Sequence, residues 1–418
     1  MNRAGKRTLA LFLSLAMAFS LACLPAQAAP VMADAAGSWA AGSIDRWAQL
    51  GIVQGDSDGN FNPANPLSRG ELATILVKMF GLTEKAENTY SDLKGDEWYA
   101  DAILKCTAAG IMKGDGVSCN ATAQISRQET MVMLGRAVGV VPAGEPDMSR
   151  FTDGAEVADW AAGYLAPLAE MGILTGVGDG SAAPAASIDR ASMMALLDKA
   201  VVEYVNAPGE VAVDNANGFV VVNVAAGEGE VVLTGTAAGV VVASGTIGGK
   251  VVAKDLSAGT VKVDGAAAVS VEGGSTVGTV AVSAAASVEI AKSAKADAVE
   301  VTGADARLTV AGTVGSVAVA ESAANTQVKA EAGAKISSVE NAAEGLTVTG
   351  KGSVGAVSTT AEAKVSTPNT VTTHTETRVD AQGNTVTTKT ETTNNSKGEA
   401  GTVKTETCLL YTSDAADE

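Results

Sequence analysis

Hydrophobic residues recur at helical spacing in the first half of the chain, between residues 29 and 205. Trp160, Tyr164 and Leu168 repeat every four residues, which predicts an amphipathic helix. Gly172 then stands where such a helix would end. Similar segments recur along this half. The pattern therefore predicts an all-α domain of short helices joined by glycine-containing loops.

A different period governs residues 206–365, where valine pairs alternate with small polar residues. Alternation with period two predicts strands, and two interleaved series of pairs each return after about 19 residues. Two strands per unit predict a parallel β-solenoid of about seven or eight turns with a valine core. Glycines at the expected corners should permit the bends; they include Gly265, Gly303 and Gly312. The valine pairs include Val261/Val263, Val280/Val282, Val299/Val301 and Val317/Val319, and, in the second series, Val269/Val271 and Val288/Ile290.

Residues 366–407 are polar and rich in threonine. Two interpretations are open. Either Thr372 to Thr393 form a hairpin around residues 380–384, or the segment is a disordered or glycosylated stalk. The only histidine of the chain, His374, lies here between threonines without an evident partner, so a catalytic role is not expected.

Composition and charge narrow the classes of function. Aromatic residues make up 4% of the 418 residues, which is unlike a compact enzyme with a large mixed core and is typical of small side chains in a regular array. The net charge of −18 argues against nucleic acid and against an anionic membrane surface as partners.

The first 28 residues have the pattern of a secretory signal. Three basic residues precede an apolar run, residues 9–21, which is too short to span a bilayer. Small residues at positions 26–28 fit a cleavage site, so the mature chain is expected to begin at Ala29. Cys23 leaves a lipoprotein as the alternative interpretation.

The last residues, 408–418, read CLLYTSDAADE and break sharply from the threonine-rich sequence before them. They match the translation of a sequencing-library adapter. We therefore expect them to be read-through, with a natural polar tail as the alternative. A further domain beyond residue 407 then stays an open hypothesis.

Cysteine and acidic residues give little sign of a metal or redox site. Cys106 and Cys119 are 13 positions apart, which permits a disulfide in an exported protein. No metal-type spacing of Cys and His is present, and neither metal nor cofactor is expected. The loop beginning at Asp56 starts like a calcium loop, but Phe61 and Leu67 replace the required Gly and Glu. This loop is therefore expected to be a turn.

Three copies of one pattern divide the first half. Each copy has a tryptophan, a Gly-Ile pair 12 residues later, and an arginine 17 or 18 residues after that. Three landmarks that keep their spacing three times indicate three structural repeats. The landmarks are Trp39, Gly51 and Arg69, then Trp98, Gly110 and Arg127, then Trp160, Gly172 and Arg190.

Each of these arginines stands at the first position of a predicted helix. Ser68 and Glu71 form a capping box, Ser126 and Glu129 form a second, and Asp189 is an N-cap in the third copy. Free N–H groups at a helix start, with a guanidinium beside them, favour a carboxylate or phosphate. A tryptophan in each repeat offers a flat face for a sugar ring. The predicted ligand is an acidic carbohydrate polymer.

Two other interpretations of these residues stay open at this point. The three tryptophans are equally well explained as core residues of each helix pair. The alternative interpretation of the three arginines is that they form surface ion pairs with a neighbouring repeat.

Further motifs accompany the landmarks: YSD at 90–92, FTD at 151–153, GNFNP at 59–63, and SRGE, SRQE and DRAS at the three helix starts. Together they resemble the S-layer homology domain family over about residues 29–203. The resemblance implies a three-pronged helical spindle whose grooves bind secondary cell-wall polysaccharide, often pyruvylated. The third copy departs from the family pattern, since Ser192 replaces Glu. The implied binding residues are Arg69, Arg127, Arg190, Trp39, Trp98, Trp160, Asp92, Asp153, Gly51, Gly110 and Gly172.

The sequence as a whole predicts an exported, non-catalytic bacterial surface protein, because no nucleophile is paired with a base. Its expected partner is secondary cell-wall polysaccharide or another peptidoglycan-linked polymer, with self-association in a surface layer and no transmembrane helix in the mature chain. The alternative is a wall-anchored exoenzyme or adhesin whose functional domain lies beyond residue 407. The expected divisions are a signal peptide (1–28), three repeats (29–85, 86–145 and 146–205), a β-solenoid (206–365), a threonine-rich stalk (366–407) and the adapter-like end (408–418).

Overall fold

The computed structural model describes residues 32–225, 227, 229–380 and 385–410. The expected signal peptide and cleavage site, the centre of the expected hairpin turn and residues 411–418 lie outside this range. The chain forms two compact units. The first contains residues up to Asn65 together with Asp189–Ala195, and the second contains Pro66–Ile188 together with Leu196 onward.

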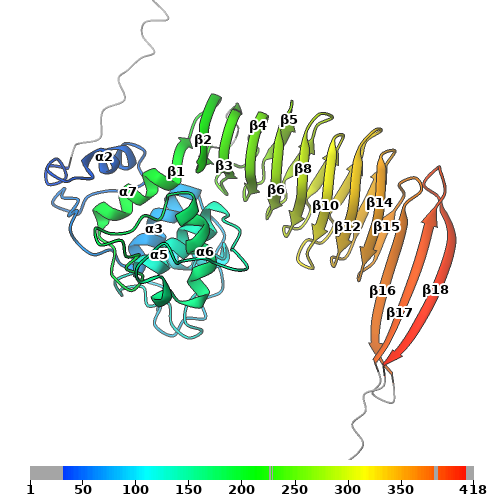
Figure 1. The fold of residues 1–418 in the computed structure, drawn as a ribbon, viewed down its shortest axis with the longest axis horizontal. Coiled ribbons are helices and arrows are strands. Elements are labelled where there is room, and N and C mark those ends of the chain that lie inside the picture. Colours follow the sequence, from blue (N-terminus) through cyan, green and yellow to red (C-terminus); the bar gives the residue numbers. More distant parts are fainter. Residues whose placement is uncertain (1–31, 226, 228, 381–384, 411–418) are drawn as a thin grey trace, which may run out of the picture. The chain divides into compact units, whose positions relative to one another are not determined.

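Six α-helices and a short 3-10 helix form the first half of the described chain (Figure 1), which confirms the predicted helical region. Two of the helices that carry the arginines begin with complete capping boxes, at Ser68 and Ser126, and end at left-handed glycines, Gly81 and Gly139. Both predicted capping boxes are therefore present. The elements are α2 (Ala41–Gln49), α3 (Arg69–Phe80), α4 (Ala100–Ala108), α5 (Arg127–Val138), η1 (Gly154–Glu156), α6 (Asp159–Glu170) and α7 (Arg190–Ala200).

A small hydrogen-bonded hub joins the three repeats just before their arginine-bearing helices. The backbone N–H of Leu67 donates to the carbonyl of Ile188, Ile125 donates to Leu67, and Ile188 donates to Ile125. All three side chains are buried. Because each repeat both donates and accepts, none of these three backbone positions lacks a partner within the core.

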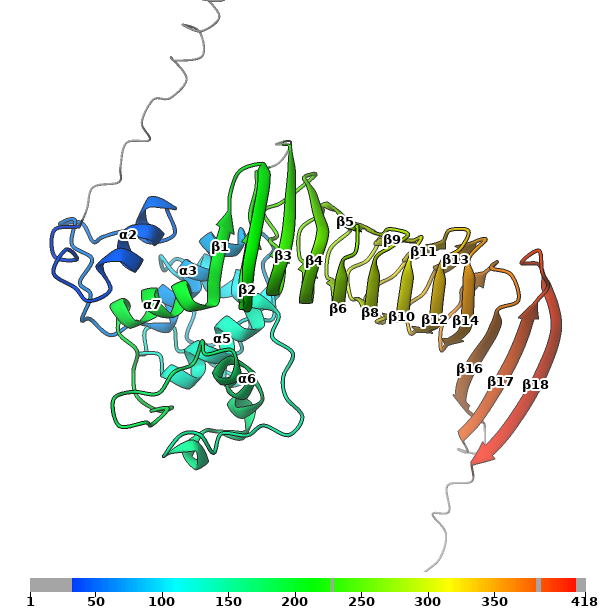
Figure 2. The same cartoon turned by 45° about the horizontal axis from the view of Figure 1, so that its top comes forward.

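Parallel strands stacked in successive turns make up the second half, as predicted. Figure 2 shows two rows of strands, with β9, β11 and β13 in one row and β8, β10, β12 and β14 in the other. The strands are β1 (Val201–Val205), β2 (Gly209–Val222), β3 (Glu230–Val242), β4 (Lys250–Val263), β5 (Ala268–Glu272), β6 (Thr276–Val282), β7 (Ser287–Ile290), β8 (Lys295–Val301), β9 (Arg307–Val310), β10 (Thr313–Val319), β11 (Gln327–Ala330), β12 (Lys335–Asn341), β13 (Leu346–Gly350), β14 (Ser353–Thr359) and β15 (Ala363–Val365).

The solenoid core consists of valines that lie opposite one another from turn to turn. Val299, Val317, Val339 and Val357 are paired in register through β8, β10, β12 and β14, and each is fully buried. Burial of a valine side chain contributes roughly 1.5 kcal/mol or more. The stack has about nine turns, and its first strand begins at Val201, inside the range that the sequence assigns to the third repeat.

The corner glycines are required for a different reason than predicted. Gly265, Gly303 and Gly312 do not have a positive φ. A Cβ on Gly312 would instead overlap the carbonyl oxygens of Ala291 and Ala294 in the preceding turn. Close approach of two backbones, and not left-handed geometry, therefore excludes a side chain there.

The threonine-rich segment forms a three-stranded antiparallel sheet. It consists of β16 (Val371–Val379), β17 (Thr385–Asn394) and β18 (Ala400–Leu410). The first part of β16 also pairs with β14 in parallel, so this sheet continues the solenoid directly. The hairpin interpretation is confirmed for the described residues of β16 and β17, which are therefore not disordered. Glycosylation of this segment stays a prediction.

Candidate functional site

An aspartate holds the loop of each repeat in the same way. Both carboxylate oxygens of Asp92 accept backbone N–H groups, from Cys119 at 2.9 Å and Asn120 at 2.8 Å. Asp153 does the same for Ala182 and Ala183. Burial raises the pKa of Asp92, but its backbone hydrogen bonds outweigh this effect and the net pKa is lowered. These predicted binding residues therefore shape the loops.

The loop that resembles a calcium site is a turn. The carboxylate of Asp56 accepts the backbone N–H groups of Asp58 and Asn60 and the side-chain amide of Asn62. These hydrogen bonds, with that from the backbone N–H of Asn60 the largest contributor, lower the pKa of Asp56. Asp56 thus fixes the backbone of the turn. A second aspartate, Asp34, accepts backbone N–H groups of the same loop, as Asp92 does for the loop of the second repeat.

The helix starts do not offer the free N–H groups that the sequence suggested. In α3 the N–H of Arg69 donates to the carbonyl of Ala123, and that of Gly70 donates to Ala121. The next N–H, of Glu71, donates to the Ser68 hydroxyl. The helix dipole remains, but the donors themselves are engaged. The prediction that an anion binds directly to these N–H groups is wrong for α3.

Each arginine reaches the loop of another repeat. Arg69 Nε donates to the carbonyl of Cys119 at 2.9 Å, and Arg127 Nε donates to that of Ala182 at 3.0 Å. Arg190 Nε donates to the carbonyl of Phe61 at 2.8 Å and its guanidinium lies over the phenyl ring, 4.5 Å from the centroid. The arginine of repeat one thus binds the loop of repeat two, the arginine of repeat two binds the loop of repeat three, and the arginine of repeat three binds the loop of repeat one.

Arg69 also forms an ion pair with the capping-box carboxylate of the second repeat. Its Nη1 lies 2.6 Å from Glu129 Oε1, and its Nη2 donates to the carbonyl of Lys113 at 3.2 Å. The residue is only 8% exposed. The ion-pair interpretation is therefore confirmed for Arg69.

The three repeat tryptophans lie on the surface. Trp39, Trp98 and Trp160 are 73%, 66% and 53% exposed, so the core interpretation is wrong and their ring faces are accessible. The buried tryptophan is Trp47, which the repeat pattern did not single out. The glycines of the Gly-Ile pairs are also exposed and left-handed, each just after the first helix of its repeat: Gly51, Gly110 and Gly172.

A cavity of about 590 Å³ gathers several of these elements into one site. Arg69 and Glu129 line it, the loop of the second repeat supplies Lys113 and Asp115, and α5 supplies Arg136. Its other lining residues are Gly114, Asn120, Ala123, Gln124, Val132, Met133 and Trp160. We call this the second-repeat groove. Arg127 and Arg190 occupy matching positions in their repeats but do not line it.

Lys113 and Arg136 are functional candidates that the repeat landmarks missed. Arg136 donates to the carbonyl of Ile111 at 3.3 Å and lies over the Tyr164 ring at 5.4 Å. Among the described residues, the ammonium of Lys113 makes no hydrogen bond or ion pair. A signal for Arg136 existed: a basic residue follows each landmark arginine by nine positions, as Lys78, Arg136 and Lys199.

The third repeat is the least complete copy. Its loop residue Ala183 has φ +48°, at the position that Asn62 and Asn120 fill in the other repeats. Asp189 caps α7 by accepting the N–H of Ser192 at 2.6 Å, which confirms the predicted N-cap. Lys199 Nζ donates to the Thr175 hydroxyl at 2.8 Å, so its ammonium is already engaged.

Cys106 and Cys119 are free thiols in this structure, so the disulfide hypothesis is wrong. Both are buried, and Cys106 Sγ donates to the carbonyl of Ala73. Burial raises the pKa of Cys106 to about 12. Burial, with a hydrogen bond to Asp92, raises that of Cys119 to about 11.

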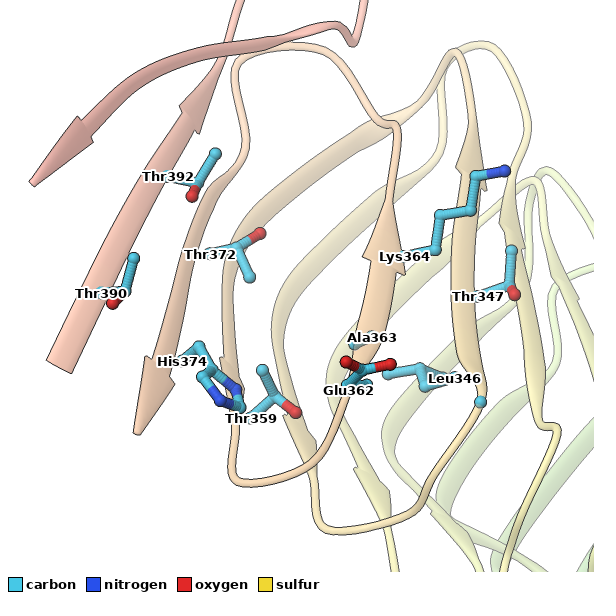
Figure 3. Close-up of a pocket in the computed structure, with 11 residues that line it drawn as sticks. Leu346, Thr347, Thr359, Glu362, Ala363, Lys364, Thr372, His374, Thr390 and Thr392 are labelled. Carbon is cyan, nitrogen blue, oxygen red and sulfur yellow. The ribbon is translucent and has the colours of Figure 1, made fainter. Parts of the chain in front are cut away.

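A second cavity, of about 500 Å³, contains the only histidine. Figure 3 shows His374 and Thr372 on β16, with Lys364 of β15 and Glu362, just before that strand, across the opening. Thr359 is the cross-strand neighbour of His374. Among the described residues the imidazole of His374 has no hydrogen-bond partner, and no Phe, Tyr or Trp side chain lines this cavity.

Comparison with known proteins identifies the three repeats. The profile of the S-layer homology domain matches the chain three times. Residues 32–73, 89–130 and 150–194 are S-layer homology domains. The matches contain the loops, caps and arginines described above. No helix in the described part of the chain combines the length and hydrophobicity of a membrane span.

Relatives share this domain region and little else. The chain is 36% identical to the surface-layer 125 kDa protein of Lysinibacillus sphaericus over 34% of this chain and 12% of that one. It is 30% identical to the S-layer protein sap of Bacillus anthracis, over 34% and 17%. It is also 30% identical to exoglucanase XynX of Acetivibrio thermocellus, over 39% and 16%. The chain thus spans less than a fifth of each of these relatives.

The S-layer homology domains and the surface-layer relatives place this chain at the bacterial cell surface and support anchoring to the cell wall.

Proposed function

We propose that the chain is a non-catalytic surface protein held to an acidic secondary cell-wall polysaccharide by its S-layer homology domains. The second-repeat groove carries this proposal, because it combines uncompensated cations with an exposed ring. The β-solenoid is the part that the anchor presents, and its outward side chains are mostly small.

The charges of the groove suit one acidic group of a sugar polymer. Arg69 is neutralised by Glu129, so it supports the loop more than it attracts a ligand. Lys113 and Arg136 then supply the available positive charge, against the single carboxylate of Asp115. A carboxylate on the ligand, such as a pyruvyl ketal, would bind to these two cations, and Trp160 would stack against the adjoining sugar. This assignment moves the expected anion contact away from the landmark arginine.

Co-sedimentation with cell-wall sacculi tests the proposal. The full chain should pellet with native sacculi and stay in solution when acid has stripped the wall polysaccharide. Lys113→Ala combined with Arg136→Ala should weaken binding about tenfold or more, because hydrogen bonds to charged groups contribute about 1.5–3 kcal/mol each. Trp160→Ala should weaken it too.

A matched control is Lys254→Ala, which removes an exposed lysine of β4 in the solenoid and should leave pelleting unchanged. Equal pelleting of the wild type with native and stripped sacculi would overturn the proposal. Unchanged binding by the Lys113/Arg136 double variant would overturn the assignment of the groove.

A second candidate function rests on the exoglucanase relative. A homologous domain region occurs in that protein, so the same anchor could hold an enzyme at the wall. Hydrolysis of xylan, starch or β-glucan by the full chain, measured as released reducing ends, would favour this candidate. Inactivity on all three is the result expected for the surface-protein proposal.

A further inference from the structure

Two columns of the solenoid core change from valine to polar residues near its last turns. In the first column, Val301, Val319, Asn341, Thr359 and His374 follow one another in register through β8, β10, β12, β14 and β16. The first four of these side chains are buried, so the column points into the core. Asn341 Nδ2 donates to Thr359 Oγ1 at 2.9 Å, whereas the imidazole of His374 has no hydrogen-bond partner among the described residues.

The second column ends at Thr372, which follows the buried Val357 in register. Its Oγ1 atom is closed off from solvent and makes no hydrogen bond within the described chain. A buried hydroxyl without a partner is unfavourable, and native structures nearly always supply one. Thr372 lines the cavity of about 500 Å³ that contains His374 (Figure 3), and a change of rotamer turns its hydroxyl toward a ligand there. A ligand in this cavity would provide the partner that the chain does not.

Polar side chains from other strands surround the same cavity. β17 supplies Thr390 and Thr392, which lie opposite His374 and Thr372 in the antiparallel register. Water can satisfy such groups, but a cavity that concentrates them is suited to a polar ligand. Across the part of the chain that the structure describes, no hydrogen bond or ion pair engages the side chains of Thr347, Glu362, Lys364, Thr390 and Thr392.

The chemistry of this lining favours a neutral, hydroxylated ligand. Each threonine hydroxyl both donates and accepts, as the hydroxyl groups of a sugar do, and the carboxylate of Glu362 accepts hydrogen bonds at both oxygens. The ammonium of Lys364 offsets the charge of Glu362, so an anion or a cation would meet repulsion as well as attraction. No group of three or more His, Cys, Asp or Glu side chains suited to a metal ion occurs among the described residues. Leu346 and Ala363 add a small apolar surface for the C–H face of a sugar ring.

We propose that this cavity binds one neutral sugar residue through hydrogen bonds. Its volume lies within the range of about 300–1,000 Å³ that is typical of small-molecule sites. Most of its polar groups are on paired strands, which hold side chains more precisely than loops do. The lining residues run from Gly345 to Thr392, so all of them precede the adapter-like end. The proposal does not depend on what the second-repeat groove binds.

The single histidine of the chain makes His374 a reporter inside the cavity. In the full chain, produced without a histidine tag and with isotope-labelled histidine, the imidazole C–H groups give one set of NMR signals. The probes are glucose, galactose, mannose and N-acetylglucosamine, each added at constant pH. At least one should shift these signals saturably, with a dissociation constant of about a millimolar, because hydrogen bonds to the protein replace hydrogen bonds to water. Inorganic phosphate at matched ionic strength should leave the signals in place.

Removal of two hydroxyl groups should weaken sugar binding. Thr390→Val with Thr392→Val keeps the β-branched shape that suits a strand, and should raise the dissociation constant about fivefold or more because hydrogen-bond partners are lost. The matched control is Thr385→Val with Thr393→Val, which changes the same strand on its opposite face. This control should leave the dissociation constant unchanged.

Thr372→Val separates a ligand site from a structural cap of the core. Valine removes the unpaired hydroxyl and keeps nearly the same shape, so the melting temperature of the protein without sugar should rise. Sugar binding should weaken at the same time, about fivefold or more. A hydroxyl with only a structural role would change the melting temperature and leave sugar binding as it was.

The proposal is overturned if none of the sugars shifts the His374 signals up to high millimolar concentration. Equal binding by the two pairs of threonine variants would also overturn it. A saturable shift with phosphate and none with the sugars would indicate an anion site instead. Pelleting with sacculi should be unchanged in all of these variants, so a failure here is distinguishable from a failure of the wall-binding proposal.

Discussion

At the residue scale, the landmark arginines act mainly between repeats. Arg69, Arg127 and Arg190 each bind a loop carbonyl more than 40 residues away in the sequence. The sequence predicted their place at a helix start, because capping motifs are local. It did not predict their carbonyl partners, since contacts over such separations depend on how the repeats pack. Spacing likewise permitted a disulfide between Cys106 and Cys119, which are free thiols in the structure.

Ala183 is the residue whose replacement should stabilise the protein. It holds a left-handed conformation, φ +48°, that alanine adopts at a cost of about 1–2 kcal/mol. In the matching loops, the asparagine side chain also donates to an aspartate, as Asn120 does to Asp115 at 3.2 Å. Ala183→Asn should therefore raise the free energy of unfolding by about 1 kcal/mol in chemical denaturation. Ala185→Asn, at an exposed position two residues later, is the control and should have little effect.

The buried thiols should show a clear dependence on pH. With pKa values raised to about 12 and about 11, Cys106 and Cys119 stay protonated in the native protein at pH 9, where an ordinary thiol is half ionised. Iodoacetamide at pH 9 should label Cys408 quickly and these two only after unfolding. The unfolded chain releases the protons at lower pH than the folded chain, so the free energy of unfolding should fall as the pH rises above about 9. Rapid native labelling of all three would contradict this burial.

At the scale of elements, the second half of the chain was predicted better than the first. Valine alternation correctly indicated a parallel solenoid, because each inward position is stacked on its equivalent in the next turn. The number of turns was slightly underestimated, because the first strand, β1, lies before residue 206, inside the range that the sequence assigned to the third repeat.

A side chain at a solenoid corner should disrupt the stack. In Gly312→Ala, the new Cβ would overlap carbonyl oxygens of Ala291 and Ala294, so the backbone of one turn must move. We expect a loss of about 1–3 kcal/mol in the free energy of unfolding. Gly274→Ala is the matched control, because its Cβ would meet only the Asp255 carboxylate at 3.5 Å. Equal stability of the two variants would show that the corner relaxes freely.

At the scale of the whole molecule, the net charge of −18 opposes the ligand that the groove attracts. An acidic wall polymer and an acidic protein repel one another over a Debye length, about 8–10 Å near physiological salt. The cations of the groove act only at contact.

Salt should therefore change the association and dissociation rates of wall binding in the same direction. Added salt screens the long-range repulsion and should raise the association rate from low ionic strength upward, while it weakens the contacts of Lys113 and Arg136 and raises the dissociation rate. Surface plasmon resonance on immobilised wall polysaccharide measures both rates. An association rate that falls steadily with added salt would indicate attraction by the whole protein surface.

The order of the arginine contacts has a consequence for how such a protein can evolve. The arginine of the third repeat binds the loop of the first, so each loop is bound by one of the three arginines and each of these arginines binds one loop. A gene duplication that inserted a fourth copy, or a deletion that left two, would leave both ends of this cycle mismatched at once. The cycle of arginine–loop contacts is complete only when three repeats are present. Recombination should therefore transfer the three repeats between genes together.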